Sequence, residues 1–298
     1  MNVVVAVPPS IASGIDLPDL VVWKGLDAPP REGISFWVPP YVVGRDPEDI
    51  RDTMSRLPGL KVVQLLTAGV EPWPGLVPDG VTLCAGKTIH GGSTAELAVA
   101  MVLSLVRDLP LYAEQQARND WSRHHPDTVA GRHVLVLGGG DIGAQVATTL
   151  RSLDAEVTVV TRSGDITLAD VPALLPTTDV LVVALPLTDA TRGLVGAEWL
   201  AALPGRAIVV NVARGPIVDL DALTEETTAG RLRAGLDVTD PEPLPADHPL
   251  WSTKGVIITP HVGGGATGWE RRAQALVGAQ VARFAGGEPL RYVVQHGY

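Results

Sequence analysis

The sequence predicts an α/β protein of two domains, each a doubly wound parallel sheet with helices on both faces, and a cleft between the domains. Three observations support this fold class. The chain has 298 residues, which is enough for about two domains. Short apolar runs rich in Val, Leu and Ile alternate with helix-like stretches, as in parallel sheets that are buried on both faces. A glycine-rich turn joins one of these runs to a helix near residue 140.

The first third of the chain contains three predicted strands and two predicted helices. The strands are the apolar runs at residues 3–7, 61–66 and 81–84. The first helix covers residues 47–57, with Asp46 as its N-cap and Pro47 at its first position. Ser93 and Glu96 match a capping box, which predicts that a long apolar helix opens there and runs to about Arg107.

From Arg132 onward the alternation becomes regular and predicts a second sheet. Its strands are expected at residues 133–137, 156–161, 180–184, 207–211, 233–236 and 256–258. Helices at residues 142–153 and 219–229 fit between them. A last helix at about residues 269–285 and a strand-like segment at residues 292–294 have no βα partner, so we expect them to return to the first domain. The predicted domains are therefore residues 1–93 with 266–298, and residues 94–265.

Gly138, Gly140 and Gly143 fit the pattern G-x-G-x-x-G between an apolar strand and a helix. In this pattern the first glycine allows a tight turn, the second lets the backbone approach a pyrophosphate, and the third lets the helix pack close to the strand. The new helix, near Asp141 and Ile142, would point its free N–H groups at the phosphates. A second strand follows at βαβ spacing, so we predict a Rossmann-like dinucleotide site. The alternative is a glycine-rich turn without a ligand.

The composition argues against several classes of partner. The formal net charge is −10, whereas a nucleic-acid-binding domain more often carries a basic face. The longest strongly apolar segment, residues 97–106, is too short to span a bilayer, and no cationic leader precedes the first apolar run. Cys84 is the single cysteine, which excludes an intrachain disulfide and fits a cytoplasmic protein. No Cys, His, Asp and Glu cluster has the spacing of a metal site.

Four sequence blocks follow one another in the second half of the chain. After the glycine turn come V-N-V-A-R-G-P-I-V-D at residues 210–219, G-L-D-V-T-D-P-E-P-L at 235–244, and H-P-L-W at 248–251 with I-I-T-P-H-V-G-G at 257–264. With these blocks in this order, the chain resembles the D-isomer-specific 2-hydroxyacid dehydrogenase family, with a likeness to its glyoxylate/hydroxypyruvate reductases. L-L-T-A-G-V at residues 65–70 and T-A-E-L at 94–97 are similar to the family's substrate-carboxylate loop and domain junction.

The resemblance implies a catalytic trio of Arg214, Glu242 and His261, and their chemistry suits the reduction of a 2-keto acid. An imidazole, which titrates near neutral pH, can give a proton to the keto oxygen. A carboxylate beside it holds the ring tautomer and favours the imidazolium. A guanidinium fork clamps the substrate carboxylate and polarises the carbonyl. The simpler alternatives are that His261 caps a turn, that Arg214 pairs with a surface acid and that Glu242 is an ordinary loop carboxylate.

Substrate and cofactor contacts follow from the same resemblance. The backbone N–H groups of Ala68, Gly69 and Val70 are expected to bind the substrate carboxylate together with Arg214 and His261. Substrate size is expected to depend on first-domain side chains near Trp37, Tyr41 and Leu66. Further cofactor contacts, mostly through backbone or shape, are expected at Thr94, Leu185, Pro186, Val212, Ala213, Asp237, Gly263 and Gly264.

The end of the second predicted strand indicates which cofactor is used. NAD enzymes usually carry an acidic residue there, which binds the ribose 2′-hydroxyl. Here the strand ends in Thr161, Arg162 and Ser163, and the first acid, Asp165, comes beyond a glycine. A cation and two hydroxyls suit a 2′-phosphate, so we predict NADP, with NAD as an alternative if Arg162 only stacks on adenine.

The sequence therefore predicts an NAD(P)-dependent oxidoreductase that reduces a small 2-keto acid to a D-2-hydroxy acid. We expect a homodimer, because symmetric dimers are the commonest oligomers. Two other functions remain open. One is a dinucleotide-responsive binding protein, similar to a corepressor. The other is oxidation of a different anion, such as a phosphite-like one, on the same scaffold.

Overall fold

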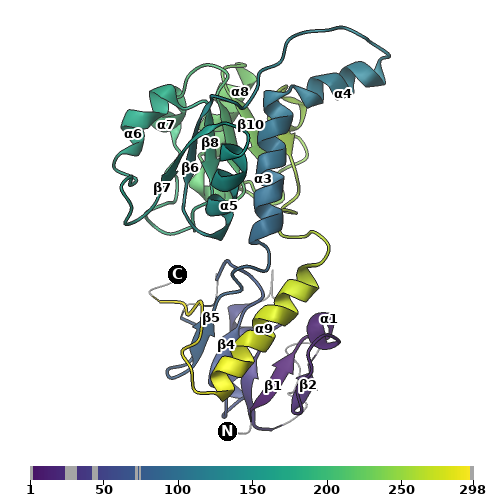
Figure 1. The fold of residues 1–298 in the computed structure, drawn as a ribbon, viewed down its shortest axis with the longest axis vertical. Helices are drawn as coiled ribbons and strands as arrows, with labels where there is room; N and C mark the ends of the chain where they lie inside the picture. The colour runs from purple at the N-terminus through teal and green to yellow at the C-terminus, as the bar shows by residue number, and fades with distance from the viewer. Residues whose placement is uncertain (1–2, 24–31, 42–45, 71–72, 74, 296–298) are drawn as a thin grey trace. The chain divides into compact units, whose positions relative to one another are not determined.

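The computed structural model describes residues 3–23, 32–41, 46–70, 73 and 75–295. The chain divides into two compact units, each with its own sheet (Figure 1). Unit 1 comprises Met1–Gly91 and Gly264–Tyr298, and unit 2 comprises Gly92–Gly263. Both crossings between the units lie two residues before the positions that the sequence suggested. Two parallel α/β sheets confirm the predicted fold class.

Unit 1 contains a five-stranded sheet in which every pairing is parallel, in the order β2-β1-β3-β4-β5. This is the flavodoxin-like order, with the order reversing beside β1. The strands are β1 (Val4–Val7), β2 (Leu20–Val22), β3 (Ile34–Trp37), β4 (Val62–Gln64) and β5 (Thr82–Cys84).

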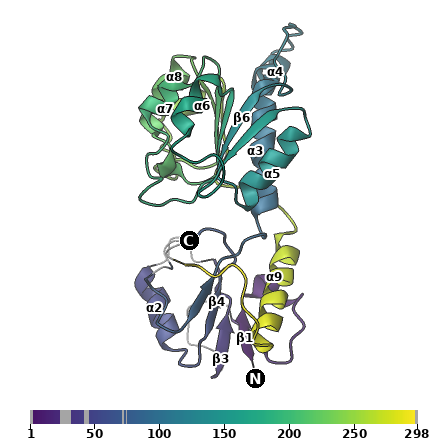
Figure 2. The same ribbon diagram turned by 60° about the vertical axis from the view of Figure 1, so that its left-hand side comes forward.

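The helices of unit 1 are α1 (Pro9–Ala12), α2 (Pro47–Ser55) and α9 (Trp269–Ala285). α2 begins as predicted, because Pro47 occupies its first position and the Asp46 carboxylate accepts the N–H of Glu48 at 2.9 Å. α2 and α9 cover opposite faces of the sheet (Figure 2). Successive residues of β1 point to opposite faces of the sheet, so Val4 packs on the α2 side and Val5 on the α9 side.

The C-terminal segment belongs to unit 1. Ala273, Val277 and Val281 of α9 are buried in the same cluster as Val5 and Phe36. Beyond the helix, Val293 forms an antiparallel bridge with Cys84. A buried Gln280 fixes this segment, because its side chain donates to Gln64 Oε1 at 2.9 Å and exchanges two hydrogen bonds with the backbone of Arg291.

Unit 2 contains a six-stranded parallel sheet in the order β11-β10-β9-β8-β6-β7. The strands are β6 (His133–Leu137), β7 (Glu156–Val160), β8 (Val180–Val183), β9 (Ile208–Asn211), β10 (Arg233–Leu236) and β11 (Val256–Ile258). The helices are α3 (Gly91–Val106), α4 (Leu109–Ala117), α5 (Asp141–Arg151), α6 (Val171–Leu174), α7 (Ala197–Ala202) and α8 (Leu220–Thr228).

Both faces of the second sheet are buried, which explains its uninterrupted apolar strands. Val134 and Val136 pack with residues of α3 and α5, whereas Leu135 and Leu137 pack with residues of α6, α7 and α8. The side chains of neighbouring strands follow the same alternation. No helix in the described part of the chain is long and apolar enough to cross a membrane.

One predicted helix start is wrong. α3 begins at Gly91, so Ser93 lies inside the first turn and is not the N-cap of a capping box. The sequence favoured a start at Ser93 because Ser93 and Glu96 match the capping-box pattern. Glycines such as Gly91 and Gly92 are uncommon within helices. Tertiary packing overrides this preference over the first two residues of the helix.

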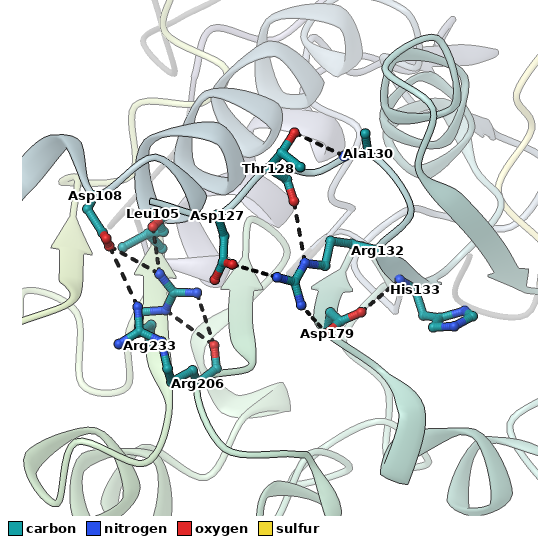
Figure 3. A network of polar contacts seen from close by, with 10 residues as sticks. All are labelled: Leu105, Asp108, Asp127, Thr128, Ala130, Arg132, His133, Asp179, Arg206 and Arg233. Atoms are coloured by element: carbon teal, nitrogen blue, oxygen red, sulfur yellow. Dashed lines mark hydrogen bonds and ion pairs between the residues drawn. The ribbon is translucent and has the colours of Figure 1, made fainter. Parts of the chain in front are cut away.

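A network of charged side chains joins the amino ends of the second sheet to the end of α3 (Figure 3). Arg233, at the start of β10, donates to the carbonyl of Leu105 at 2.7 Å and lies 3.4 Å from Asp108. Arg132 pairs with Asp127 at 2.7 Å and with Asp179 at 3.1 Å. These charged groups find their hydrogen-bond and ion-pair partners at the amino edge of the sheet. The predicted functional residues lie at the carboxyl edge.

Candidate active site

The predicted functional residues of unit 2 follow the carboxyl ends of its strands. Gly138 comes after β6, Leu185 after β8, Arg214 after β9, Glu242 after β10 and His261 after β11. Because all six strands are parallel, these ends lie along one edge of the sheet. Ligands of open α/β sheets bind outside this edge, at the point where the strand order reverses. Here the order reverses at β6, whose neighbours are β7 and β8.

Two of the three motif glycines are required by close backbone contacts. Gly138 has φ +109°, and a Cβ there would lie 2.5 Å from the carbonyl oxygen of Ala184. A Cβ on Gly143 would lie 1.8 Å from the carbonyl oxygen of Gly138, so this glycine lets α5 pack on the turn. These are the roles that the sequence predicted for the first and third glycines.

The second motif glycine is different because it faces open space. A Cβ on Gly140 would meet no atom within 4 Å among the described residues. Gly140 is the N-cap of α5 and provides no side-chain cap, so the first N–H groups of the helix point outward there. The side chain of Asp141 is held by Gln145 at 2.8 Å. This open helix N-terminus fits the pyrophosphate of a dinucleotide.

The three residues predicted to choose the cofactor lie just beyond β7. Thr161 packs on the glycine turn, since a Cβ on Gly139 would lie 2.5 Å from its methyl group. The backbone N–H of Thr161 bonds the carbonyl of Ile166 and closes the loop. Arg162 and Ser163 are exposed at the tip of this loop, where a guanidinium and a hydroxyl can reach a bound phosphate.

The loop that carries Arg214 is fixed from within by Asn211. This asparagine is 1% exposed, and its amide donates to the carbonyl of Arg214 at 3.0 Å. Its side-chain oxygen accepts the N–H of Ala213 at 3.0 Å. Arg214 itself is partly buried, and its guanidinium reaches the carbonyl of Ala213 at 2.7 Å.

Gly215 joins the Arg214 loop to the loop that carries Glu242. A Cβ on Gly215 would lie 1.9 Å from the carbonyl oxygen of Thr239, so only glycine allows the two backbones to approach this closely. The hydroxyl of Thr239 then donates to the carbonyl of Pro241 at 2.8 Å, one residue before Glu242.

His261 and Glu242 form a direct pair. The Nδ1 atom of His261 lies 2.6 Å from Oε1 of Glu242, and both side chains are about half exposed. The backbone of His261 has φ +52°, an uncommon conformation for a residue with a side chain. Because Nδ1 meets the carboxylate, Nε2 is the ring nitrogen that can exchange a proton with a substrate.

Asp237 holds the His261 loop in this conformation. Its buried carboxylate accepts the hydroxyl of Thr259 at 2.6 Å and the backbone N–H groups of Val262 and Gly263 at 2.8 and 2.9 Å. Its carbonyl accepts the N–H of His261 at 2.8 Å. The sequence predicted a cofactor contact for Asp237, and the structure gives its carboxylate these three protein donors.

The remaining predicted cofactor residues are largely buried or glycine. Thr94 is buried, and a Cβ on Gly263 would lie 3.2 Å from its methyl group and 2.9 Å from the Asp237 carboxylate. The carbonyl of Pro186 accepts the hydroxyl of Thr191 at 2.7 Å. Val212 and Ala213 are buried behind the Arg214 loop, and Leu185 lies beside Gly138, whereas Gly264 belongs to unit 1.

The predicted carboxylate-binding loop of unit 1 follows β4. The Thr67 hydroxyl donates to the carbonyl of Gly69 at 2.6 Å and folds the loop on itself. Ala68 is exposed and Val70 is buried. Among the described residues, no protein acceptor takes the N–H groups of Ala68, Gly69 or Val70, so these groups are available to an anion.

Two of the three side chains expected to set substrate size belong to the core of unit 1. Trp37 is buried, and its ring centroid lies 5.5 Å from that of Trp23 and 5.9 Å from that of Trp73. Leu66 is also buried. The sequence did not determine where these side chains lie, because their positions at strand ends do not reveal which face they occupy. Tyr41 is exposed and contacts His90.

Sequence reasoning gave no role to Asn211 or His90. Asn211 had a detectable signal, because a polar residue at the last position of a buried apolar strand is unusual unless it serves the following loop. His90 had none. The described residues also contain no group of three or more His, Cys, Asp or Glu side chains that could hold a metal ion.

Comparison with known proteins gives a consistent result. Residues 99–263 match the "D-isomer specific 2-hydroxyacid dehydrogenase, NAD binding domain". The chain is 30% identical to the human glyoxylate reductase/hydroxypyruvate reductase over 237 residues, which are 74% of this chain and 72% of that protein. It is 32% identical to glyoxylate/hydroxypyruvate reductase A of Photorhabdus laumondii over 260 residues, 80% and 79% of the two chains.

Solved structures extend the likeness to the whole fold. A D-isomer specific 2-hydroxyacid dehydrogenase from Xanthobacter autotrophicus, in complex with NADPH and MES, has a TM-score of 0.83 at 31% identity over 99% of both chains. The NADPH-dependent glyoxylate/hydroxypyruvate reductase of Sinorhizobium meliloti, in complex with NADP and sulfate, has a TM-score of 0.84 at 27% identity, also over 99% of both chains. The chain belongs to the D-isomer specific 2-hydroxyacid dehydrogenase family and is an NAD(P)-dependent oxidoreductase.

Proposed function

We propose that this protein reduces a small 2-keto acid, of the size of glyoxylate or hydroxypyruvate, to the D-2-hydroxy acid. The observation that carries the proposal is the 2.6 Å pair between His261 and Glu242 on the sheet edge that also carries the glycine turn. A proton-transfer group is thereby fixed on the same edge as the expected nicotinamide cofactor. When bound, that cofactor supplies a hydride to the keto carbon.

His261 acts as the general acid in the reduction. Its Nε2 holds the proton that passes to the keto oxygen as the carbonyl carbon becomes tetrahedral. Glu242, on Nδ1, keeps the ring in one orientation and stabilises the imidazolium before the transfer. In the reverse reaction the same nitrogen accepts the hydroxyl proton.

Arg214 binds the substrate carboxylate and polarises the adjacent carbonyl. A guanidinium presents two parallel N–H donors, which match the two oxygens of a carboxylate. The hydrogen bonds of Asn211 and the close packing of Gly215 fix the backbone from which the side chain extends. The N–H groups of Ala68, Gly69 and Val70 offer a second carboxylate-binding element.

We infer that NADPH is preferred to NADH. The loop after β7 offers Thr161, Arg162 and Ser163 to a 2′-phosphate, and its first carboxylate, Asp165, comes after Gly164. The Xanthobacter and Sinorhizobium structures contain NADPH and NADP, respectively, which supports this choice. The curated relatives named glyoxylate/hydroxypyruvate reductase support the substrate class.

The proposal includes a domain assignment and a homodimer. Residues 94–265 would bind the dinucleotide, and residues 1–93 with 266–298 would complete the substrate site. α4 has no buried residue, and Leu109 on it and Trp121 after it are exposed, which supports an oligomer that covers them. Sedimentation velocity of the wild type against Trp121→Arg tests the oligomer, and a wild-type monomer would reject it.

The function is tested by mixing the purified protein with NADPH and a panel of 2-keto acids, and by following absorbance at the nicotinamide wavelength. Turnover of short keto acids, with formation of the D-hydroxy acid, is expected. Tight NADPH binding without turnover on any acid would instead favour a dinucleotide-responsive binding protein. Reduction of NADP by an inorganic anion such as phosphite would favour the third function.

A further inference from the structure

His90 and Gly264 lie at the two points where the chain crosses between the units. His90 is one residue before the last residue of the first segment of unit 1, and Gly264 is the first residue of the returning segment. Although 174 residues separate them, Nδ1 of His90 lies 2.7 Å from the carbonyl oxygen of Gly264. The two backbones are also close, because a Cβ on Gly264 would lie 3.3 Å from the Cβ and Cγ atoms of His90.

The chemistry of the neighbours decides the state of the His90 ring. A carbonyl oxygen only accepts, so Nδ1 carries a proton and donates it to Gly264. Nε2 lies 2.8 Å from the hydroxyl of Tyr41 and accepts from it when the ring is neutral. The rings of Tyr41 and His90 also pack against Trp269, with centroids 5.5 and 5.9 Å away.

The electrostatic surroundings favour this same arrangement. Burial, with a smaller effect of the Arg272 guanidinium, lowers the pKa of His90, although the carbonyls of Gly264 and Leu66 act in the opposite direction. Partial burial and the nearby Glu270 carboxylate raise the pKa of Tyr41 to about 12. At neutral pH the tyrosine therefore keeps its proton and the histidine stays neutral.

Gly264 ends the short loop that carries His261. Asp237 binds the first three residues of this loop. Its carbonyl oxygen accepts the N–H of His261, and its carboxylate accepts the N–H groups of Val262 and Gly263. His90 holds the fourth, at the Gly264 carbonyl. The loop is thus fixed at both ends by side chains from distant parts of the sequence.

We propose that His90 is a positioning residue for the reaction: it fixes the Gly264 end of the His261 loop, and the Tyr41 hydroxyl fixes the His90 ring. His90 makes no chemical step itself. The proposal rests on the proposed role of His261 as general acid. Its consequence is that the Nδ1–H donor of His90, more than the bulk of its ring, is needed for fast hydride and proton transfer.

The test compares three substitutions that separate the donor from the ring. His90→Asn places an amide N–H near the position of Nδ1, His90→Gln places one near Nε2, and His90→Phe keeps an aromatic ring without a donor. We expect kcat for keto-acid reduction within about 3-fold of wild type for the asparagine variant. For the other two we expect losses of about 10- to 100-fold, as for a catalytic group displaced by up to about 1 Å.

Two measurements distinguish positioning from a general loss of structure. The Kd for NADPH should stay within about 2-fold in all three variants, because the glycine turn belongs to unit 2. The primary isotope effect with cofactor deuterated at the transferred position should rise in the glutamine and phenylalanine variants, because chemistry becomes slower than product release. Tyr41→Phe should give a smaller loss of the same kind.

Controls separate this proposal from the function on which it rests. No keto-acid turnover by the wild type, or full activity of His261→Ala, would reject the proposed function and this inference together. If His261→Ala is inactive but His90→Gln keeps the wild-type kcat and isotope effect, only the inference fails. Equal losses of kcat in His90→Asn and His90→Gln would also overturn the inference. If His90→Phe does not fold, the comparison of His90→Asn with His90→Gln is sufficient for the test.

Discussion

At the scale of single residues, the site depends on a few side chains with defined partners. His261 and Glu242 are half exposed and available to a ligand, whereas Asp237 and Asn211 behind them are almost completely buried. Asp237 organises the backbone of the His261 loop, and Asn211 organises the backbone of the Arg214 loop. Loss of the exposed groups should therefore affect catalysis, and loss of the buried ones should affect both stability and catalysis.

Removal of the general acid should slow the reaction without weakening cofactor binding. We expect His261→Ala to lower kcat by at least about 100-fold, since general acid catalysis contributes roughly 10²- to 10⁴-fold. Steady-state kinetics with NADPH and a fluorescence titration of NADPH binding check this, with His125→Ala as a control. A His261→Ala enzyme as fast as the wild type would contradict the assigned role.

The buried carboxylate of Asp237 allows a sharper comparison. In Asp237→Asn, an amide NH2 replaces one acceptor and faces a backbone N–H, so a buried donor is left without a partner. We expect the free energy of unfolding to fall by about 1–3 kcal/mol. Thr259→Val removes one of the three donors and should cost less. Urea denaturation measures both, and an Asp237→Asn protein as stable as wild type would show that the carboxylate does not hold the loop.

Cofactor preference can be assigned to one exposed side chain. Arg162→Ala should lower kcat/KM with NADPH by about 10-fold or more, because a charge-assisted hydrogen bond to a phosphate contributes about 1.5–3 kcal/mol. The value with NADH should hardly change. Kinetics with both cofactors decide the matter, and a wild-type preference for NADH would reject the assignment.

At the scale of elements, the carboxyl ends of parallel strands collect the functional loops on one edge, and the charged network of Arg132 and Arg233 occupies the other edge (Figure 3). In the turn between β6 and α5, two glycines serve different structural purposes. Gly143 supports the packing of a helix, whereas Gly140 leaves space for a ligand.

A pair of alanine substitutions tests that distinction. Gly143→Ala would place its Cβ 1.8 Å from the Gly138 carbonyl, so the turn must deform. We expect lower thermal stability and no measurable NADPH binding. Gly140→Ala meets no protein atom within 4 Å, so it should leave the unfolding temperature almost unchanged and weaken NADPH binding. Calorimetry and fluorescence titration check this, and a matched loss of stability in both variants would be the contrary result.

The β5 strand carries the single cysteine into the core, between β4 and the returning C-terminal segment. Burial raises the pKa of the Cys84 thiol to about 11. Since the thiolate is the reactive form, iodoacetamide at pH 8 should modify the native protein hardly at all and the urea-unfolded protein readily. Mass spectrometry follows the modification, and rapid labelling of the folded enzyme would contradict the buried assignment.

At the scale of the whole molecule, each unit has its own sheet and its own core. A ligand bound by one unit should therefore stabilise chiefly that unit. At free NADPH of about 100 times Kd, linkage gives about 2.7 kcal/mol. We expect slower amide hydrogen exchange in β6 to β11 and little change in β1 to β5 when substrate is absent. Equal protection of both sheets would show that the cofactor alone couples the two units.

Much of the order of the elements could be predicted from the sequence alone, and the site residues were proposed from local motifs. Continuous apolar runs predicted nine of the strands, because strands buried on both faces leave this local pattern. The glycine spacing and the arginine, glutamate and histidine blocks are local as well. β2 and β3 left too weak a pattern, since both are short and lie among prolines and loops.

Only the tertiary structure decided which side chains fix the site. Asp237 accepts hydrogen bonds from the His261 loop, which lies 24–26 positions away in the sequence. His90 bonds Gly264, which lies 174 positions away. No periodicity or motif marks such pairs, because they arise when parallel strands bring their carboxyl ends together and when the returning α9 brings Gly264 back to unit 1. Local propensity acts over a few residues, whereas these contacts depend on how the whole chain packs.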